Sequence, residues 1–334
     1  MKLLLSYGTR PEYIKLKPLI KALEGKIPFE VLFTGQQKDI GTGEFTKQKS
    51  ISDGDNRLDS IVTSLLNDDW IYAGITHVMV QGDTTSAFAI ALGAFHRQIK
   101  VIHLEAGLRT HGKNPYPEEG NRRMIDCISD IHLAPTLDNY KNLVEEGFNT
   151  SYIHRVGNTG IDNLKGIGIS YNNEVIVTMH RRENHARMGE WFKEIDDLAQ
   201  ANPSLKFILP MHPNPNVRKH WNSLKSVQVC APINYEEMID LIAGCKFLIS
   251  DSGGLQEEAS FFNKKIIVCR VSTERPETVG VHSFLCPTPE ELPDLFEQVK
   301  EKPIPDKHYC PYGDGSASEK VVQVLINEIT IGVG

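Results

Sequence analysis

Three carboxylates in the first half of the sequence are placed where they could transfer protons. Asp83 ends the apolar run 78–83, Glu105 ends the apolar run 101–105, and Glu118 stands just before an expected helix. Acids that lie close together have their pKa values driven apart, so that one can accept a proton while another donates one. The competing interpretation is that Asp83 and Glu118 only cap helices.

A glycine-containing turn in the second half is typical of an anion site. Ser252, Gly253 and Gly254 follow a strongly apolar run and open an expected helix, where a hydroxyl and backbone N–H groups converge on a phosphate. Glu257 and Glu258, one turn into that helix, could accept hydrogen bonds from a ribose diol. A simple capped turn, with the two acids complementing the helix dipole, is the alternative.

Cationic and imidazole groups follow other expected strands. Arg10 and Arg275 could clamp a diphosphate, since a guanidinium matches phosphate oxygens, and His212 could donate to the pyrophosphate. His180 is a candidate acid, base or sugar-orienting group, and Arg181 adds positive charge. Taken singly, each could instead be an exposed arginine or a structural histidine.

The sequence contains no motif that predicts a metal or a cofactor. The run HRRENH at 180–185 lacks a further ligand at helical spacing, so no metal is expected there. No GxxxxGK[ST] occurs, and the segment 41–43 lacks the third glycine and the preceding strand of a dinucleotide loop. ATP and nicotinamide are therefore not expected.

Elements that alternate between strand and helix must position these residues. Short β-rich runs alternate with helical patterns in both halves, which predicts an α/β fold of two Rossmann-like, doubly wound domains with a deep cleft between them. The polar, glycine-rich segment 38–60 is expected to be a loop, and a domain boundary is expected within 157–173. The expected strands lie at 3–7, 29–33, 77–80, 101–104, 131–133, 175–179, 207–209, 247–250 and 266–269. The expected helices include 85–94, 122–129, 191–199, 235–243 and 255–262.

Bulk properties exclude several classes of protein. A length of 334 residues with 40% hydrophobic content suits two cores, and a net charge of -7 argues against nucleic-acid binding. The N-terminal run 1–7 is expected to be a buried strand rather than a signal peptide, and no run predicts membrane insertion. Six cysteines without a CxxC pair suit reduced thiols in the cytoplasm.

Taken together, these blocks resemble one family, the UDP-N-acetylglucosamine 2-epimerases of the non-hydrolysing type. The resemblance runs nearly end to end through GTRPEYIKLKPLI, QGDTTSAF, HLEAGLRT, PYPEEGNR, GNTGIDNL, HRREN, MHPNPNVR, DSGGLQEEAS, TERPE and PYGDG. It implies a GT-B-like fold that forms a homodimer, with one domain at 1–164 plus a C-terminal helix within 316–334 and a UDP-binding domain at 165–315.

The resemblance also implies roles for individual residues. At the reacting sugar it places Asp83, Glu105, Glu118 and His180. The substrate-binding set that it implies for UDP and sugar is Arg10, Lys15, Arg122, Arg181, His212, Ser252, Gly253, Gly254, Glu258 and Arg275.

The implied reaction is reversible epimerisation at C2 of UDP-N-acetylglucosamine to UDP-N-acetylmannosamine through a 2-acetamidoglucal, with no cofactor. The alternatives are a hydrolysing 2-epimerase that releases N-acetylmannosamine and UDP, and a 2-epimerase of a related UDP-diacetamido sugar. From other classes, a GT-B glycosyltransferase would share the UDP clamp but needs an acceptor, and a nucleotide-sugar sensor would bind without turnover.

Overall fold

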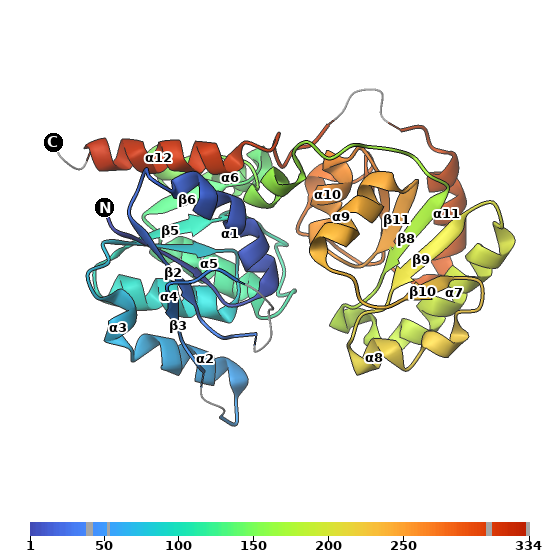
Figure 1. Cartoon of the computed structure of the whole chain (residues 1–334), viewed down its shortest axis with the longest axis horizontal. Helices are drawn as coiled ribbons and strands as arrows, with labels where there is room; N and C mark the ends of the chain where they lie inside the picture. Colours follow the sequence, from blue (N-terminus) through green and yellow to red (C-terminus); the bar gives the residue numbers. More distant parts are fainter. Residues whose placement is uncertain (38–42, 52–53, 305–308, 332–334) are drawn as a thin grey trace. The chain divides into compact units, whose positions relative to one another are not determined.

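The computed structural model describes residues 1–37, 43–51, 54–304 and 309–331. Contacts between residues divide the chain into two compact units (Figure 1). Unit 1 comprises Met1–Asn163 together with Tyr312–Gly334, and unit 2 comprises Leu164–Pro311. The chain therefore leaves unit 1, forms the whole of unit 2, and returns to complete unit 1.

Unit 1 contains a parallel sheet with strand order β3-β2-β1-β4-β5-β6-β7 among the described residues. The β1 strand is buried along its whole length, as expected of a strand with helices on both faces. The strands are β1 (Leu3–Tyr7), β2 (Phe29–Phe33), β3 (Lys47–Gln48), β4 (His77–Gln81), β5 (Lys100–Leu104), β6 (Ile131–Ala134) and β7 (Ile153–Arg155).

Helices cover both faces of this sheet. One core packs Leu16 and Leu19 of α1 and Val321 and Leu325 of α12 against the strands, and Figure 1 shows α12 running beside α1. The opposite core contains residues of α2 and α4. The helices are α1 (Arg10–Leu23), α2 (Arg57–Leu66), α3 (Asp69–Tyr72), α4 (Thr85–His96), α5 (Glu118–Ile128), α6 (Leu137–Glu145) and α12 (Ala317–Ile331).

Unit 2 repeats the architecture with a parallel sheet of order β10-β9-β8-β11-β12-β13. Its strands are β8 (Glu174–Thr178), β9 (Lys206–Pro210), β10 (Gln228–Cys230), β11 (Phe247–Ser250), β12 (Lys265–Val268) and β13 (Ser283–Leu285). Its helices are α7 (Met188–Ala201), α8 (Pro215–Arg218), α9 (Tyr235–Gly244), α10 (Gly254–Phe261) and α11 (Leu292–Glu301). The sheet and helices α7, α8 and α11 enclose a separate apolar core.

Two adjacent buried lysines at the start of β12 bind the C-terminal ends of helices. The Lys264 ammonium donates to the carbonyl oxygen of Cys245, the C-cap of α9, at 2.8 Å, and also to the carbonyl of Ser170. The Lys265 ammonium donates to the carbonyls of Val299 and Lys302 at the end of α11. Burial lowers the pKa of each lysine to about 8, while the carbonyl oxygens favour the charged forms.

The predicted α/β class with two Rossmann-like units is confirmed, and two local expectations are wrong. The segment 38–60 is not entirely a loop, because β3 lies within it and α2 begins at Arg57, where the Asn56 side chain accepts from the N–H of Leu58. The helix expected from residue 122 begins at Glu118, so this residue opens α5 rather than preceding it. The segment 41–42 lies outside the described residues.

Candidate active site

The predicted site residues of each unit gather where the order of strands reverses. In unit 1 the reversal lies between β1 and β4, and in unit 2 it lies between β8 and β11. Loops that leave neighbouring parallel strands at such a point diverge and leave room for a ligand at the carboxyl edge of the sheet. The loops after β1, β4 and β5 and those after β8, β9 and β11, together with the helices α1, α5 and α10 that follow them, carry the predicted side chains except Arg275, which follows β12.

The loop between β1 and α1 is held by a buried acid that the sequence analysis missed. Glu12 accepts hydrogen bonds from the N–H groups of Gly8 at 3.0 Å and Thr9 at 2.8 Å, and from the Thr9 hydroxyl. Its other oxygen accepts from the hydroxyl of Thr84, beside Asp83. Burial raises the pKa of Glu12 to about 7, although these hydrogen bonds oppose the shift. Glu12 therefore ties the loop after β1, which carries Arg10, to the loop after β4.

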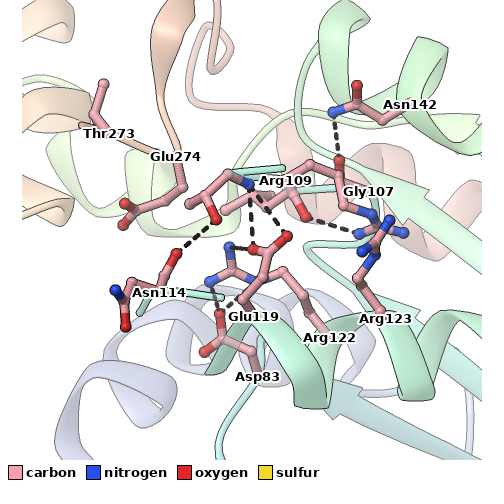
Figure 2. Close-up of polar contacts among 12 residues, drawn as sticks. Asp83, Gly107, Arg109, Asn114, Glu119, Arg122, Arg123, Asn142, Thr273 and Glu274 are labelled. Atoms are coloured by element: carbon pink, nitrogen blue, oxygen red, sulfur yellow. Dashed lines mark hydrogen bonds and ion pairs between the residues drawn. The ribbon is translucent and has the colours of Figure 1, made fainter. Parts of the chain in front are cut away.

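Asp83 follows β4 and is gripped by Arg122 of α5. The Arg122 Nε lies 3.0 Å from Oδ2 of Asp83, and NH1 of the same guanidinium lies 3.0 Å from Oε2 of Glu119 (Figure 2). The side-chain amide of Asn121 donates to the backbone carbonyl of Asp83 at 2.9 Å. Helix α5 thus orients the carboxylate at the end of β4.

Glu105 follows β5 and adopts an unusual backbone conformation. Its φ of 74° lies in the left-handed region, which a residue with a side chain occupies only when its surroundings enforce it. Its carboxylate forms an ion pair with Lys15 of α1 and accepts from the side-chain amides of Gln81 and, at 3.1 Å, Asn158. Lys15 and Glu105, which are predicted to serve one site, are therefore in direct contact.

Glu118 is half-buried at the start of α5, whereas its neighbour Glu119 is almost completely buried. Glu119 accepts from the backbone N–H of Thr110 at 3.2 Å and binds Arg122, so it is a structural partner of the site. Asp83 and Glu105 follow neighbouring strands, and a Cβ added at Gly82 would lie 3.4 Å from Oε2 of Glu105. The structure therefore brings Asp83, Glu105, Lys15 and Arg122 to one edge of the unit 1 sheet.

Asp251 organises the corresponding edge of unit 2. It is fully buried and accepts from the backbone N–H groups of His180 at 3.0 Å and Arg181 at 2.9 Å. The Nδ1 of His180 lies 3.4 Å from its carboxylate, and the rings of His180 and His212 stack with centroids 5.1 Å apart. Burial lowers the pKa of both histidines, with Asp251 opposing the shift, so both rings are neutral near pH 7.

Gly253 and Gly254 lead into α10 beside a cluster of buried charges. A Cβ at Gly253 would lie 2.6 Å from Oε1 of Glu274 and 2.7 Å from Nη1 of Arg275, so any side chain at this position would have to displace its surroundings. Arg275 forms ion pairs with Glu257 and Glu274. Although burial raises the pKa of Glu274, Arg275 and Arg270 hold it well below its usual range. The predicted phosphate clamp Arg275 is thus already held in place by acids.

The remaining predicted residues of unit 2 are Ser252, in the loop after β11, and Glu258, the fifth residue of α10. Ser252 directs its backbone N–H to the hydroxyl of Ser250 at 2.9 Å. The sequence analysis missed Glu12, Asp251 and Glu274 as positioning residues. A signal for Glu12 exists, because a threonine followed three residues later by glutamate at a helix start is a capping box.

The described part of the chain contains neither a metal-binding cluster nor a membrane-spanning helix. Among these residues no group of three or more histidine, cysteine or acidic side chains could hold a metal ion. None of the described helices is long and apolar enough to serve as a transmembrane span.

Comparisons with known proteins agree with one another. Residues 66–326 match the family model described as UDP-N-acetylglucosamine 2-epimerase. A UDP-N-acetylglucosamine 2-epimerase of Campylobacter jejuni is 36% identical, over 97% of this chain and 97% of that protein.

Solved structures are similar along the same length. The UDP-GlcNAc 2-epimerase of Neisseria meningitidis bound to UDP-GlcNAc has a TM-score of 0.89 at 32% identity, covering 98% of this chain and 100% of that one. The UDP-GlcNAc 2-epimerase of Methanocaldococcus jannaschii in complex with UDP-GlcNAc and UDP has a TM-score of 0.82 at 28% identity, with 98% and 100% covered.

Proposed function

We propose, because this chain belongs to the UDP-N-acetylglucosamine 2-epimerase family, that it converts UDP-N-acetylglucosamine reversibly into UDP-N-acetylmannosamine without releasing the sugar. The relatives of known structure that bind UDP-GlcNAc and UDP support this substrate. The observation that carries the proposal is the pair of carboxylates, Asp83 and Glu105, that follow the neighbouring parallel strands β4 and β5, each held by a cation.

In the proposed reaction UDP must begin to leave C1 before a base can remove the proton on C2. The hydrogen on C2 of a hexose is not acidic, since no carbonyl neighbours it. When the bond between C1 and the UDP oxygen breaks, its electron pair leaves with UDP and positive charge develops at C1. A positioned carboxylate can then remove the C2 proton, which gives a 2-acetamidoglucal and UDP.

The return path inverts C2. A proton is delivered to C2 from the opposite face, and the UDP oxygen forms its bond to C1 again, so atoms and charge balance over the cycle. We assign the proton transfers to the group of Asp83, Glu105, Glu118 and His180. Two groups on opposite faces of the sugar are needed, because one group on one face would return the original configuration.

We assign the binding of UDP to the loops of unit 2. The backbone N–H groups at Gly253 and Gly254 open α10, where the helix terminus favours a phosphate. Arg275, fixed by Glu257 and Glu274, needs little reorganisation to stabilise the departing diphosphate. We place His212, Arg181, Ser252 and Glu258 in the same binding set, and Arg10, Lys15 and Arg122 in unit 1.

The test is turnover of UDP-N-acetylglucosamine in deuterium oxide, followed by NMR without an acceptor sugar. We expect deuterium at C2 and a product in which UDP remains attached. Free N-acetylmannosamine with UDP would instead identify a hydrolysing 2-epimerase, and turnover only with an acceptor would identify a glycosyltransferase. A panel that includes UDP-diacetamido sugars tests the substrate.

We further propose that the protein acts in the cytoplasm, which suits six cysteines without a CxxC pair, and that it forms a homodimer, as the family resemblance implies. Sedimentation equilibrium of the whole chain tests the dimer, and a monomer at micromolar concentration would contradict it.

A further inference from the structure

A chain of charged groups that is buried at His103, Asp126 and Arg109 and ends at the exposed Glu146 lies near the loops that carry Asp83 and Glu105. The Nδ1 of His103, on β5, lies 2.6 Å from Oδ1 of Asp126 on α5, and both side chains are fully buried. The other oxygen of Asp126 accepts from NH2 of Arg109 at 2.7 Å. Arg109 in turn binds Glu146 through Nε at 2.7 Å and NH2 at 2.6 Å.

The far side of the His103 ring faces a second acceptor. Its Nε2 lies 2.8 Å from the backbone carbonyl oxygen of Gly82, the residue before Asp83. A carbonyl oxygen only accepts. Although burial raises the pKa of Asp126, His103 and Arg109 hold it below its ordinary value, so this carboxylate is ionised and also only accepts. Both ring nitrogens of His103 must therefore carry hydrogen, which makes the ring an imidazolium.

The neighbouring histidine, His132, differs from His103 in its hydrogen bonds and in its protonation. His132 on β6 is the register partner of His103, and it donates from Nε2 to the backbone carbonyl of Asp126 at 2.9 Å. Its Nδ1 has no hydrogen-bond partner among the described residues, and burial lowers its pKa, so His132 is neutral. His103 and Arg109 thus both face the buried carboxylate of Asp126, and Arg109 also pairs with Glu146, an exposed acid that Arg123 approaches at 3.5 Å.

The charged ring fixes the peptide that precedes Asp83. Gly82 has a φ of 64°, and its N–H donates to the carbonyl oxygen of Leu104 on β5 at 2.9 Å. Its carbonyl is held by His103 on the same strand. Residues of strand β5 therefore bind both the N–H and the carbonyl of Gly82. These two hydrogen bonds fix the orientation of the peptide between Gly82 and Asp83.

We propose that His103 is a positioning residue that carries hydrogen on both ring nitrogens, and that it sets the place of Asp83 by donating to the Gly82 carbonyl while it donates to Asp126. The inference rests on the proposed function in so far as Asp83 takes part in proton transfer. His103 itself does not touch the substrate in this account. Its effect on the reaction passes through the backbone at Gly82.

The first experiment needs no variant and no activity. A joint neutron and X-ray structure of the wild-type protein in deuterium oxide, at about pH 8, shows the hydrogens on each ring. We expect deuterium on both nitrogens of His103 and on Nε2 alone of His132. A single deuterium on His103 would overturn the proposal whatever reaction the enzyme catalyses.

The second experiment compares two isosteric changes. In His103→Asn the amide nitrogen replaces Nδ1, so the bond to Asp126 is kept and the Gly82 anchor is lost. In His103→Gln the amide nitrogen replaces Nε2, so a donor to Gly82 remains. We expect the Asn variant to lose about 100-fold in kcat with KM within about 3-fold, because a small misplacement of a reacting group has that effect. The kcat of the Gln variant should be at least about 10-fold higher than that of the Asn variant.

A merely structural role predicts a different pattern. The two variants would then be equally impaired, and His132→Gln, which removes a buried histidine without touching Gly82, would be impaired to the same degree. Crystal structures of the folded variants give a readout independent of turnover. The Gly82–Asp83 peptide should be displaced in His103→Asn and in place in His103→Gln, and an undisplaced peptide in His103→Asn would refute the positioning role even if the proposed reaction is wrong.

Discussion

One guanidinium, that of Arg122, joins Asp83 to Glu119. The Nε of Arg122 lies 3.0 Å from Asp83, its NH1 lies 3.0 Å from Glu119, and only 4% of its side chain is exposed. Glu119 is buried and belongs to the same turn of α5, so it fixes the arginine, which in turn fixes the more exposed Asp83. Asp83, which has access to solvent, is therefore oriented by Arg122, and the buried Glu119 holds Arg122 in place.

Asp83→Asn should abolish turnover while UDP binding persists. The amide keeps the size of the side chain but cannot accept a proton, and Glu119 still holds Arg122. We expect kcat to fall by at least about 1,000-fold, with the Kd for UDP within about 3-fold by calorimetry. Glu118→Gln should behave in the same way. An equal loss of UDP binding in either variant would assign that residue a structural role.

Gly253→Ala should weaken UDP binding without unfolding the chain. The added Cβ would lie 2.6 Å from a carboxylate oxygen of Glu274, which Arg270 and Arg275 hold in place, so the loop before α10 must move. We expect the Kd for UDP to rise at least about 10-fold, as when a ligand loses one or two charge-assisted hydrogen bonds. Gly168→Ala is the matched control, because no atom lies within 4 Å of the added carbon. Equal affinities in the two variants would show that the loop does not hold UDP.

Glu12→Gln should change how stability depends on pH. Burial raises the pKa of Glu12 from 4.5 to about 7, so between these values the folded chain holds a proton that the unfolded chain releases. The contribution of this carboxyl therefore makes the free energy of unfolding fall as pH rises through that range, by up to about 3 kcal/mol. Glutamine does not titrate, and its single amide oxygen can still accept from Gly8 and Thr9, while its amide nitrogen can only donate toward the hydroxyl of Thr84.

The measurement is urea unfolding of both proteins at about pH 5 and pH 8, where the variant should gain relative to wild type at the higher pH. Glu24→Gln, an exposed change at the C-cap of the same helix, should alter the midpoint less than Glu12→Gln does. A constant difference between wild type and Glu12→Gln at the two pH values would show that the hydrogen bonds to Glu12 cancel the effect of burial.

Lys264→Met should destabilise unit 2. Its ammonium binds the carbonyls of Ser170 and Cys245 and lies 3.5 Å from the ring centroid of Tyr171, and methionine would leave both carbonyls without this donor. We expect a loss of about 2 kcal/mol in the free energy of unfolding. Lys193→Met, which breaks an exposed ion pair with Asp197 on α7, should change it little, and equal effects would contradict the helix-end role of Lys264.

Much of the fold could be predicted from the periodicity of the hydrophobic residues and from the turn residues that separate the elements. Strand β11 is predicted at its observed bounds because three apolar residues and a serine are followed by a glycine turn. Strand β3 could not be found, since two residues carry no pattern and their place depends on pairing with β2. The start of α2 was missed because its buried residues, Ile61 and Leu65, come after the polar stretch that indicated a loop.

The loops of the site can be located from the sequence, but the buried residues that hold these loops in place cannot. Asp83 and Glu105 stand at the ends of apolar runs, which makes them visible. Asp126 and Glu12 lie within helices, where acids are normally exposed, and their burial depends on partners such as His103 and Thr84 that are remote in sequence. Composition alone cannot reveal such pairs.

The late return of the chain to unit 1 has a consequence for biosynthesis. Val321 and Leu325 of α12 fill part of the core beside α1, and they are synthesised after every residue of unit 2. The part of the unit 1 core that α12 covers therefore stays open until unit 2 has been synthesised, although α1 already covers its neighbouring part. A chain that stops before α12 would leave this apolar surface exposed, and such surface makes an incomplete chain prone to aggregation.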